Sequence, residues 1–147
     1  MKDIETFLSK HRSIGLDTNI LIAFFEANAS YTGVSIELFD KIAQIQNQVW
    51  LSVISIPEFM FKAEQVGNEA IVGQYEKFLY QSPFKFAGVD KACARQASRV
   101  GGYYRLGALD SLILASLYDQ GVTGFITADK HFKHVMVPEV FLIQKRP

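Results

Sequence analysis

Four acidic residues of this sequence occupy positions that an α/β fold would bring together: Asp17, Glu58, Asp110 and Asp129. Clustered carboxylates repel one another, and two of them about 4 Å apart cost about 4 kcal/mol at an effective dielectric constant of about 20. A divalent cation with oxygen ligands relieves this repulsion. The acidic set therefore predicts a metal-dependent enzyme that acts on phosphate esters.

Three of these acids also have a purely structural interpretation. Asp17 follows a short apolar stretch and could cap the helix that begins near Thr18. Glu58 stands three residues after Ser55, which is the spacing of a capping box. Asp129 could cap a turn after another apolar stretch. Taken one at a time, these positions do not distinguish a helix cap from a metal ligand.

A capping role explains Asp110 least well. It shares a helical face with Ile113, Leu114 and Leu117, in a helix that is apolar nearly all round and should be buried. Burying an ion costs several kcal/mol, whereas a helix N-terminus returns at most about 1 kcal/mol in most settings. We therefore expect this carboxylate to be paired, coordinated or neutralised.

The composition is that of a compact globular protein. The 147 residues, 49% of them apolar, predict one domain over residues 1–147 with a substantial core. No apolar run approaches the roughly 20 residues that span a bilayer, and residues 1–13 lack the apolar stretch of a secretory signal. Cys93 is the only cysteine, so no internal disulfide can form. These features predict a soluble cytoplasmic protein.

The formal net charge is zero, with fifteen basic and fifteen acidic residues. Net charge therefore does not make this chain a general binder of polyanions. If it handles nucleic acid, a local basic patch and a bound metal must attract the backbone.

Helical and extended patterns alternate along most of the chain, which predicts the α/β class: a three-layer α/β/α sandwich with a central parallel sheet of four or five strands. Ligands of such sheets bind outside the carboxyl ends of the strands, where Asp17 and Asp129 are expected. Gly101 and Gly102 are predicted to stop the helix that Asp90 caps. One expected helix begins near residue 18, and the other expected helices cover about residues 2–11, 34–46, 55–65, 69–80, 91–100 and 109–120. The expected strands cover 14–16, 49–53, 84–89, 124–127 and 140–143.

Four short segments carry a resemblance to a known family. In order and spacing they resemble the motifs of the PIN domain superfamily, and within it most of all the VapC toxins. The likeness extends over about residues 13–143, and residues 1–12 form a helical extension before the point where many relatives begin. The segments are GLDTN at 15–19, SVISIPE at 52–58, LDSLILA at 109–115 and ITADKHF at 126–132.

The resemblance implies a metal-dependent endoribonuclease that hydrolyses RNA phosphodiester bonds. The four family acids match Asp17, Glu58, Asp110 and Asp129, which makes these the implied catalytic residues. One or two Mg²⁺ or Mn²⁺ ions would be held by the three aspartates, with the glutamate bound directly or through water. Thr127 matches the usual hydroxyl neighbour of the fourth acid.

Residues near the acids could support the site or contact the substrate. Asn19 could hold a ligand or a metal-bound water, or cap the helix. Lys130 and Lys133 flank Asp129 and are candidates to meet a phosphate backbone, and Arg105 is a further candidate contact for RNA. The resemblance also implies three partners: the RNA substrate, a cognate antitoxin protein and a second copy of the chain.

Three alternatives remain open from the sequence. A catalytically inactive PIN-like module could bind RNA or act as a scaffold. A phosphatase could use Asp17 as its nucleophile, although such chemistry commonly wants an acid where Asn19 stands. A structural α/β domain could use all four acids as helix caps, and Asp110 is the weakest point of that interpretation.

Overall fold

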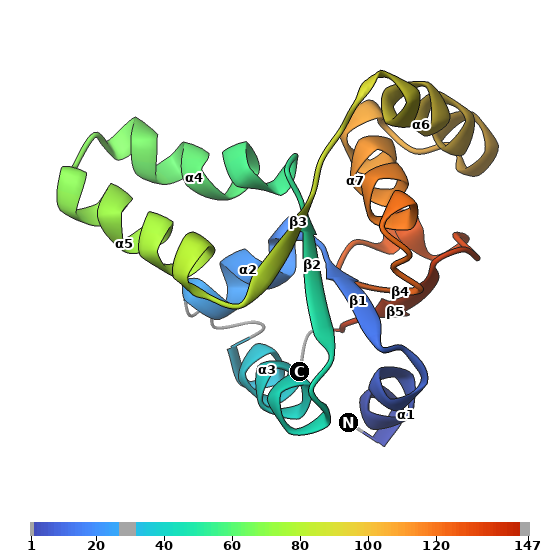
Figure 1. The fold of residues 1–147 in the computed structure, drawn as a ribbon. Coiled ribbons are helices and arrows are strands. Elements are labelled where there is room, and N and C mark those ends of the chain that lie inside the picture. The colour runs from blue at the N-terminus through green and yellow to red at the C-terminus, as the bar shows by residue number, and fades with distance from the viewer. Residues whose placement is uncertain (1, 27–31, 145–147) are drawn as a thin grey trace.

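The computed structural model describes residues 2–26 and 32–144, with the exception of the side chains of residues 2 and 32 (Figure 1). No helix in that part of the chain has the length and apolarity needed to cross a membrane. Every predicted helix and strand is present. The helices are α1 (Lys2–Lys10), α2 (Thr18–Phe25), α3 (Thr32–Ile45), α4 (Ser55–Val66), α5 (Glu69–Gln81), α6 (Lys91–Tyr104), α7 (Ala108–Asp119) and the 3-10 turn η1 (Lys130–Phe132), and the strands are β1 (Ser13–Leu16), β2 (Gln48–Ser52), β3 (Phe84–Ala87), β4 (Gly124–Thr127) and β5 (Glu139–Leu142).

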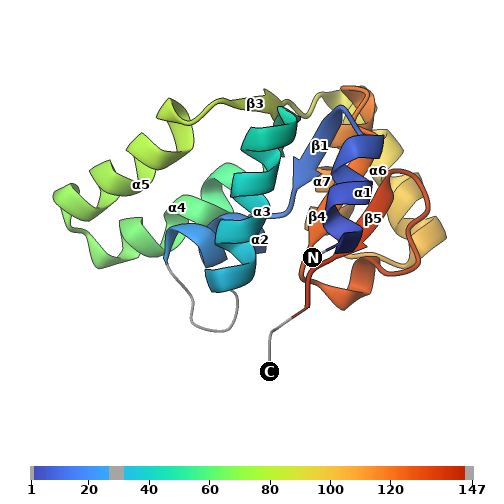
Figure 2. The ribbon, with the colours of Figure 1, turned by 90° about the horizontal axis from the view of Figure 1, so that it is seen from below.

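The five strands form one parallel sheet in the order β3-β2-β1-β4-β5. The chain builds outward from β1 to β2 and β3, and then returns to place β4 on the other side of β1. Helices α1 to α5 cover one face of the sheet, and α6 and α7 cover the other (Figures 1 and 2). This arrangement confirms the predicted α/β/α sandwich, with five strands.

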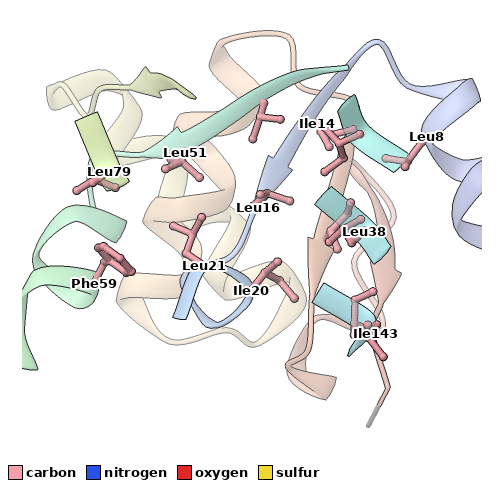
Figure 3. Close-up of a cluster of buried hydrophobic side chains, with 14 of the residues drawn as sticks. Leu8, Ile14, Leu16, Ile20, Leu21, Leu38, Leu51, Phe59, Leu79 and Ile143 are labelled. Carbon is pink, nitrogen blue, oxygen red and sulfur yellow. The ribbon is translucent and has the colours of Figure 1, made fainter. Parts of the chain in front are cut away.

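Side chains along each strand point alternately to the two faces of the sheet, and each face has its own hydrophobic core. Leu16 and Leu51 point to the larger core, where they meet helical residues such as Ile20, Leu21 and Phe59 (Figure 3). The alternate strand residues, such as Trp50 and Phe125, face the second core, under α7. This alternation is the period of two that places successive strand side chains on opposite faces. The helices that carry the acids are thereby anchored on both sides of the sheet.

The largest difference from a predicted boundary is at the end of α6. Helix α6 does not stop at Gly101 and Gly102 but continues through both to Tyr104, and Arg105 ends it with φ of 58°. A helical glycine costs roughly 1 kcal/mol relative to alanine, and packing outweighs that cost here. A Cβ atom at Gly101 would lie 2.6 Å from Ser111 Oγ, so glycine is what allows α6 to approach α7 this closely.

Candidate active site

The four acids lie at the beginnings of four helical segments. Asp17 caps α2 directly after β1, and Asp129 caps η1 after β4. Glu58 and Asp110 stand in the first turns of α4 and α7. Strands β1 and β4 are neighbours, with Leu16 paired to Ile126, so the reversal of strand order puts the first and fourth acids at adjacent strand ends. Helix N-termini carry partial positive charge that favours carboxylates.

Asp17 is buried, with 6% of its surface exposed, and both of its carboxylate oxygens accept hydrogen bonds. Oδ1 accepts from the backbone N–H of Thr18 at 2.8 Å. Oδ2 accepts from the Thr127 hydroxyl at 2.7 Å and from the Asn19 amide at 3.2 Å. The carboxylate of Asp17 is thus held in a defined orientation by its neighbours.

Burial raises the pKa of Asp17 from 3.8 to about 6, because desolvation penalises the charged form. The hydrogen bonds from Thr127 and Thr18 act in the opposite direction. The negative charges of Asp110 and Glu58 raise the pKa further. Three of the four acids therefore interact electrostatically at this end of the sheet.

Thr127 joins the first and fourth acids. It is fully buried, and its hydroxyl donates to Asp17 while accepting the backbone N–H of Asp129 at 3.0 Å. The carboxylate of Asp129 accepts from the backbone N–H of His131 at 2.9 Å and lies 2.7 Å from the ring Nδ1 of that histidine. Asn19 provides a second link between the segments of the first and fourth acids. Its amide donates to Asp17, and its Oδ1 accepts the backbone N–H of Ala128 at 3.3 Å.

Asp110 is half-buried, although the helix that carries it is as buried as predicted. Desolvation raises its pKa, and the charges of Asp129 and Glu58 raise it further, while His131 lowers it. Among the described residues, no hydrogen bond or ion pair compensates this carboxylate. Its pKa therefore reflects repulsion from the neighbouring acids on top of partial burial.

The interpretation of Ser55 and Glu58 as a capping box is wrong. The cap position of this helix is Ile54, which makes no side-chain cap bond, and Ser55 already lies inside the helix. The Ser55 hydroxyl instead lies 2.9 Å from the hydroxyl of Thr18, which in turn lies 2.7 Å from Glu58 Oε1. Glu58 is thus tied to α2, where the sequence pattern had suggested a bond within its own helix.

The PIN domain family model matches residues 14–137. The chain belongs to the PIN domain family. A search of curated proteins gives no match. Of the solved structures, VapC20 from Mycobacterium tuberculosis, described as a sarcin-ricin loop cleaving toxin, superposes with a TM-score of 0.69 at 16% identity, over 86% of this chain and 98% of that one. DNA-bound VapBC from Salmonella typhimurium gives a TM-score of 0.68 at 18% identity, over 88% and 96%.

A third structural neighbour is VapBC2 from Rickettsia felis, bound to a DNA fragment from its promoter. It matches with a TM-score of 0.63 at 16% identity, over 91% of this chain and 99% of that one. These identities establish a shared fold. Together with the family match, they confirm the resemblance to PIN domains with VapC toxins as structural neighbours.

The donor set of this PIN domain fits a hard divalent cation. The four acids offer carboxylate oxygens, and in the described part of the chain no lysine or arginine pairs with any of them. As the side chains stand, no three His, Cys, Asp or Glu residues among those described converge as a ligand cluster. Because Mg²⁺ keeps several of its waters, one or two direct carboxylates are enough to bind it.

The three predicted cationic contacts are all exposed. Lys130 and Lys133 lie in and directly after η1, beside Asp129, and Arg105 ends α6 shortly before Asp110. None of them forms an ion pair within residues 2–26 and 32–144. Their charges are therefore not neutralised by a described acid.

Thr18 is the site residue that sequence reasoning missed. In the sequence it is one of three helix-capping residue types in a row, and no pattern separates its hydroxyl from an ordinary cap. The contact with Glu58 joins residues forty positions apart, so only the fold reveals it.

Proposed function

We propose that this PIN domain protein is a metal-dependent endoribonuclease that hydrolyses RNA phosphodiester bonds, and that it is the toxin of a VapBC-type toxin–antitoxin pair. The observation that carries the proposal is the set of four acids at the starts of four helical segments, with Asp17 buried and without a cationic partner among the described residues. Membership of the PIN domain family supports the nuclease chemistry.

In this proposal Asp17, Asp110 and Asp129 would hold Mg²⁺ or Mn²⁺, with Glu58 bound directly or through water. A bound divalent ion lowers the pKa of a coordinated water and offsets charge on the phosphate. Glu58 would orient the attacking water or accept its proton. Thr127 orients Asp17 by donating to its Oδ2.

The partners follow from the same proposal. A further structural neighbour, from Klebsiella pneumoniae, is described as a toxin–antitoxin complex. We propose that this protein binds a cognate antitoxin and forms a homodimer. Light scattering of the purified protein, alone and with the antitoxin, measures both associations.

The test of the proposed activity is cleavage of total RNA by the purified protein with Mg²⁺ or Mn²⁺, with the fragment ends mapped. We expect discrete cuts that disappear when a chelator removes the metal and return when the ion is added back, because the acids alone repel a phosphate. Cleavage that persists in chelator would contradict metal dependence. Metal-saturated protein that binds RNA without cutting it would instead support the inactive module.

Charge reversal at Lys130 and Lys133 tests the RNA contact beside Asp129. We expect the Lys130→Glu/Lys133→Glu variant, made in a cleavage-deficient Asp17→Asn background, to bind single-stranded RNA more weakly. The slope of log affinity against log salt should fall by about 1.4, since each lost phosphate contact on a single strand removes about 0.7. Lys77→Glu, an exposed charge reversal on α5, is the control. An unchanged slope in the double variant would exclude this contact.

A further inference from the structure

Thr18 connects two of the four acids directly. Its backbone N–H donates to Oδ1 of Asp17 at 2.8 Å, and its hydroxyl oxygen lies 2.7 Å from Oε1 of Glu58. The residue is buried, with 5% of its surface exposed. One buried residue on α2 therefore contacts both acids, the one that follows β1 through its backbone N–H and the one on α4 through its hydroxyl.

The direction of the hydroxyl bonds follows from the number of protons. Thr18 has a single hydroxyl proton, and its oxygen lies within hydrogen-bond distance of both Ser55 and Glu58. An ionised carboxylate can only accept, so Thr18 donates to Glu58. Ser55 is fully buried and then satisfies its own proton by donating to Thr18. The hydroxyl proton of Ser55 is thus used in the bond to Thr18, and the hydroxyl proton of Thr18 is used in the bond to Glu58.

Glu58 needs such support because it is exposed. A glutamate on a helix surface samples several rotamers, and holding it in one of them costs side-chain entropy. A hydrogen bond to a charged group is among the stronger ones in proteins and can offset that cost. The bond from Thr18 therefore selects the rotamer in which the carboxylate faces α2 and Asp17.

We propose that Thr18 is a positioning residue that holds the carboxylate of Glu58 at Asp17, with Ser55 orienting its hydroxyl. The inference rests on the proposed function, in which Glu58 takes part in RNA cleavage. Thr18 itself touches neither the RNA nor the ion in this assignment. It acts only through the acid that it orients.

Three variants test the assignment: Thr18→Val, which removes the hydroxyl but keeps the shape, Thr18→Ser, which keeps the hydroxyl, and Glu58→Gln. We expect Thr18→Val to lower kcat about ten- to hundredfold, the usual effect of losing a partner that orients a metal-site ligand, with KM for RNA changed less than about twofold. Thr18→Ser should stay within about threefold of the wild type. Thermal unfolding checks that each variant is folded.

A double-mutant cycle shows whether Thr18 acts through Glu58. In the Glu58→Gln background, we expect Thr18→Val to lower kcat by less than about twofold further. A full additional loss in that background overturns the inference, because Thr18 would then act by another route. So does a Thr18→Ser protein as impaired as Thr18→Val, or a Thr18→Val protein with wild-type kcat.

Mn²⁺ titration separates failure of this inference from failure of the proposed function. If the wild type cuts no RNA, the nuclease proposal fails, and the dissociation constant for Mn²⁺ still reports on the site. The positioning role is sustained if the dissociation constant for Mn²⁺ rises about tenfold or more in both Thr18→Val and Glu58→Gln and does not rise further in the double variant. Equal dissociation constants in Thr18→Val and wild type, or no Mn²⁺ binding by the wild type, would refute it.

Discussion

Replacing Asp17 with asparagine should lower RNA cleavage by about a thousandfold or more while leaving the fold intact. Asparagine keeps the size of the side chain and an oxygen that can accept the Thr18 N–H, but it removes the buried negative charge that would bind a cation. A thousandfold loss corresponds to about 4 kcal/mol of transition-state stabilisation, and a catalytic metal supplies several kcal/mol. The measurement is the cleavage rate on a defined RNA, with circular dichroism to confirm folding.

Asp90 provides a matched control for that substitution. It is also an aspartate at a helix N-cap, accepting the backbone N–H of Cys93 at 2.7 Å, but it caps α6 and is not among the four acids. We expect Asp90→Asn to change the cleavage rate by less than about threefold, since loss of a cap affects stability and leaves the site charge intact. If Asp17→Asn kept a tenth or more of wild-type activity, Asp17 would not be a metal ligand.

Ionisation of Asp17 should cost the metal-free protein stability as the pH rises from about 4 to about 6, and Asp17→Asn should remove that contribution. The pKa of Asp17 is raised to about 6 in the folded protein, against 3.8 for an unperturbed aspartate. The folded state therefore binds this proton more tightly than the unfolded chain, and removing the proton costs stability. The difference between the two pKa values corresponds to about 3 kcal/mol.

Urea unfolding in the presence of a chelator, at several pH values from 4 to 8, measures this effect. The free energy of unfolding of Asp17→Asn, minus that of the wild type, should grow by about 2.4 kcal/mol between pH 4 and pH 7 and then level off. Adding Mg²⁺ or Mn²⁺ at pH 7 should stabilise the wild type more than the variant, because a ligand stabilises only the state that binds it. Parallel pH profiles for the two proteins would show that burial of Asp17 carries no such penalty.

These two expectations describe one trade-off. The charge that the proposed metal site requires is the charge that destabilises the metal-free fold. Active sites commonly show this relation between stability and function. Here its physical origin is the burial of Asp17, to which the charges of Glu58 and Asp110 add.

Local patterns were sufficient for most of the fold. The order of helices and strands follows from apolar periodicity and from capping and breaking residues, as with Asp90 at the start of α6 and Gly67 at the end of α4. The parallel sheet follows from the alternation of strands with helices. The prediction failed where a contact between distant residues decided the result, as at Gly101, whose packing against Ser111 let the helix continue.

The site, like the fold, has some features that local sequence patterns determine and others that depend on contacts between distant residues. The sequence by itself determined which acids lie at strand and helix ends, because β1 and β4 are short apolar runs directly before Asp17 and near Asp129. It determined neither the half-buried state of Asp110 nor the partner of Glu58. The exposure of Asp110 depends on how the first turn of α7 packs in the fold, and the partner of Glu58 depends on how closely α2 approaches α4.

Residue types and short-range spacing thus determined the elements of this protein, its PIN-like order of motifs and the identity of its acids. The tertiary structure alone decided that Thr127 joins Asp17 to the backbone of Asp129, and that Thr18 joins Asp17 to Glu58. The physical reason is the distance along the chain over which each effect acts. Periodicity and capping act over a few residues, whereas burial, charge repulsion and hydroxyl bonding depend on which distant segments the sheet brings side by side.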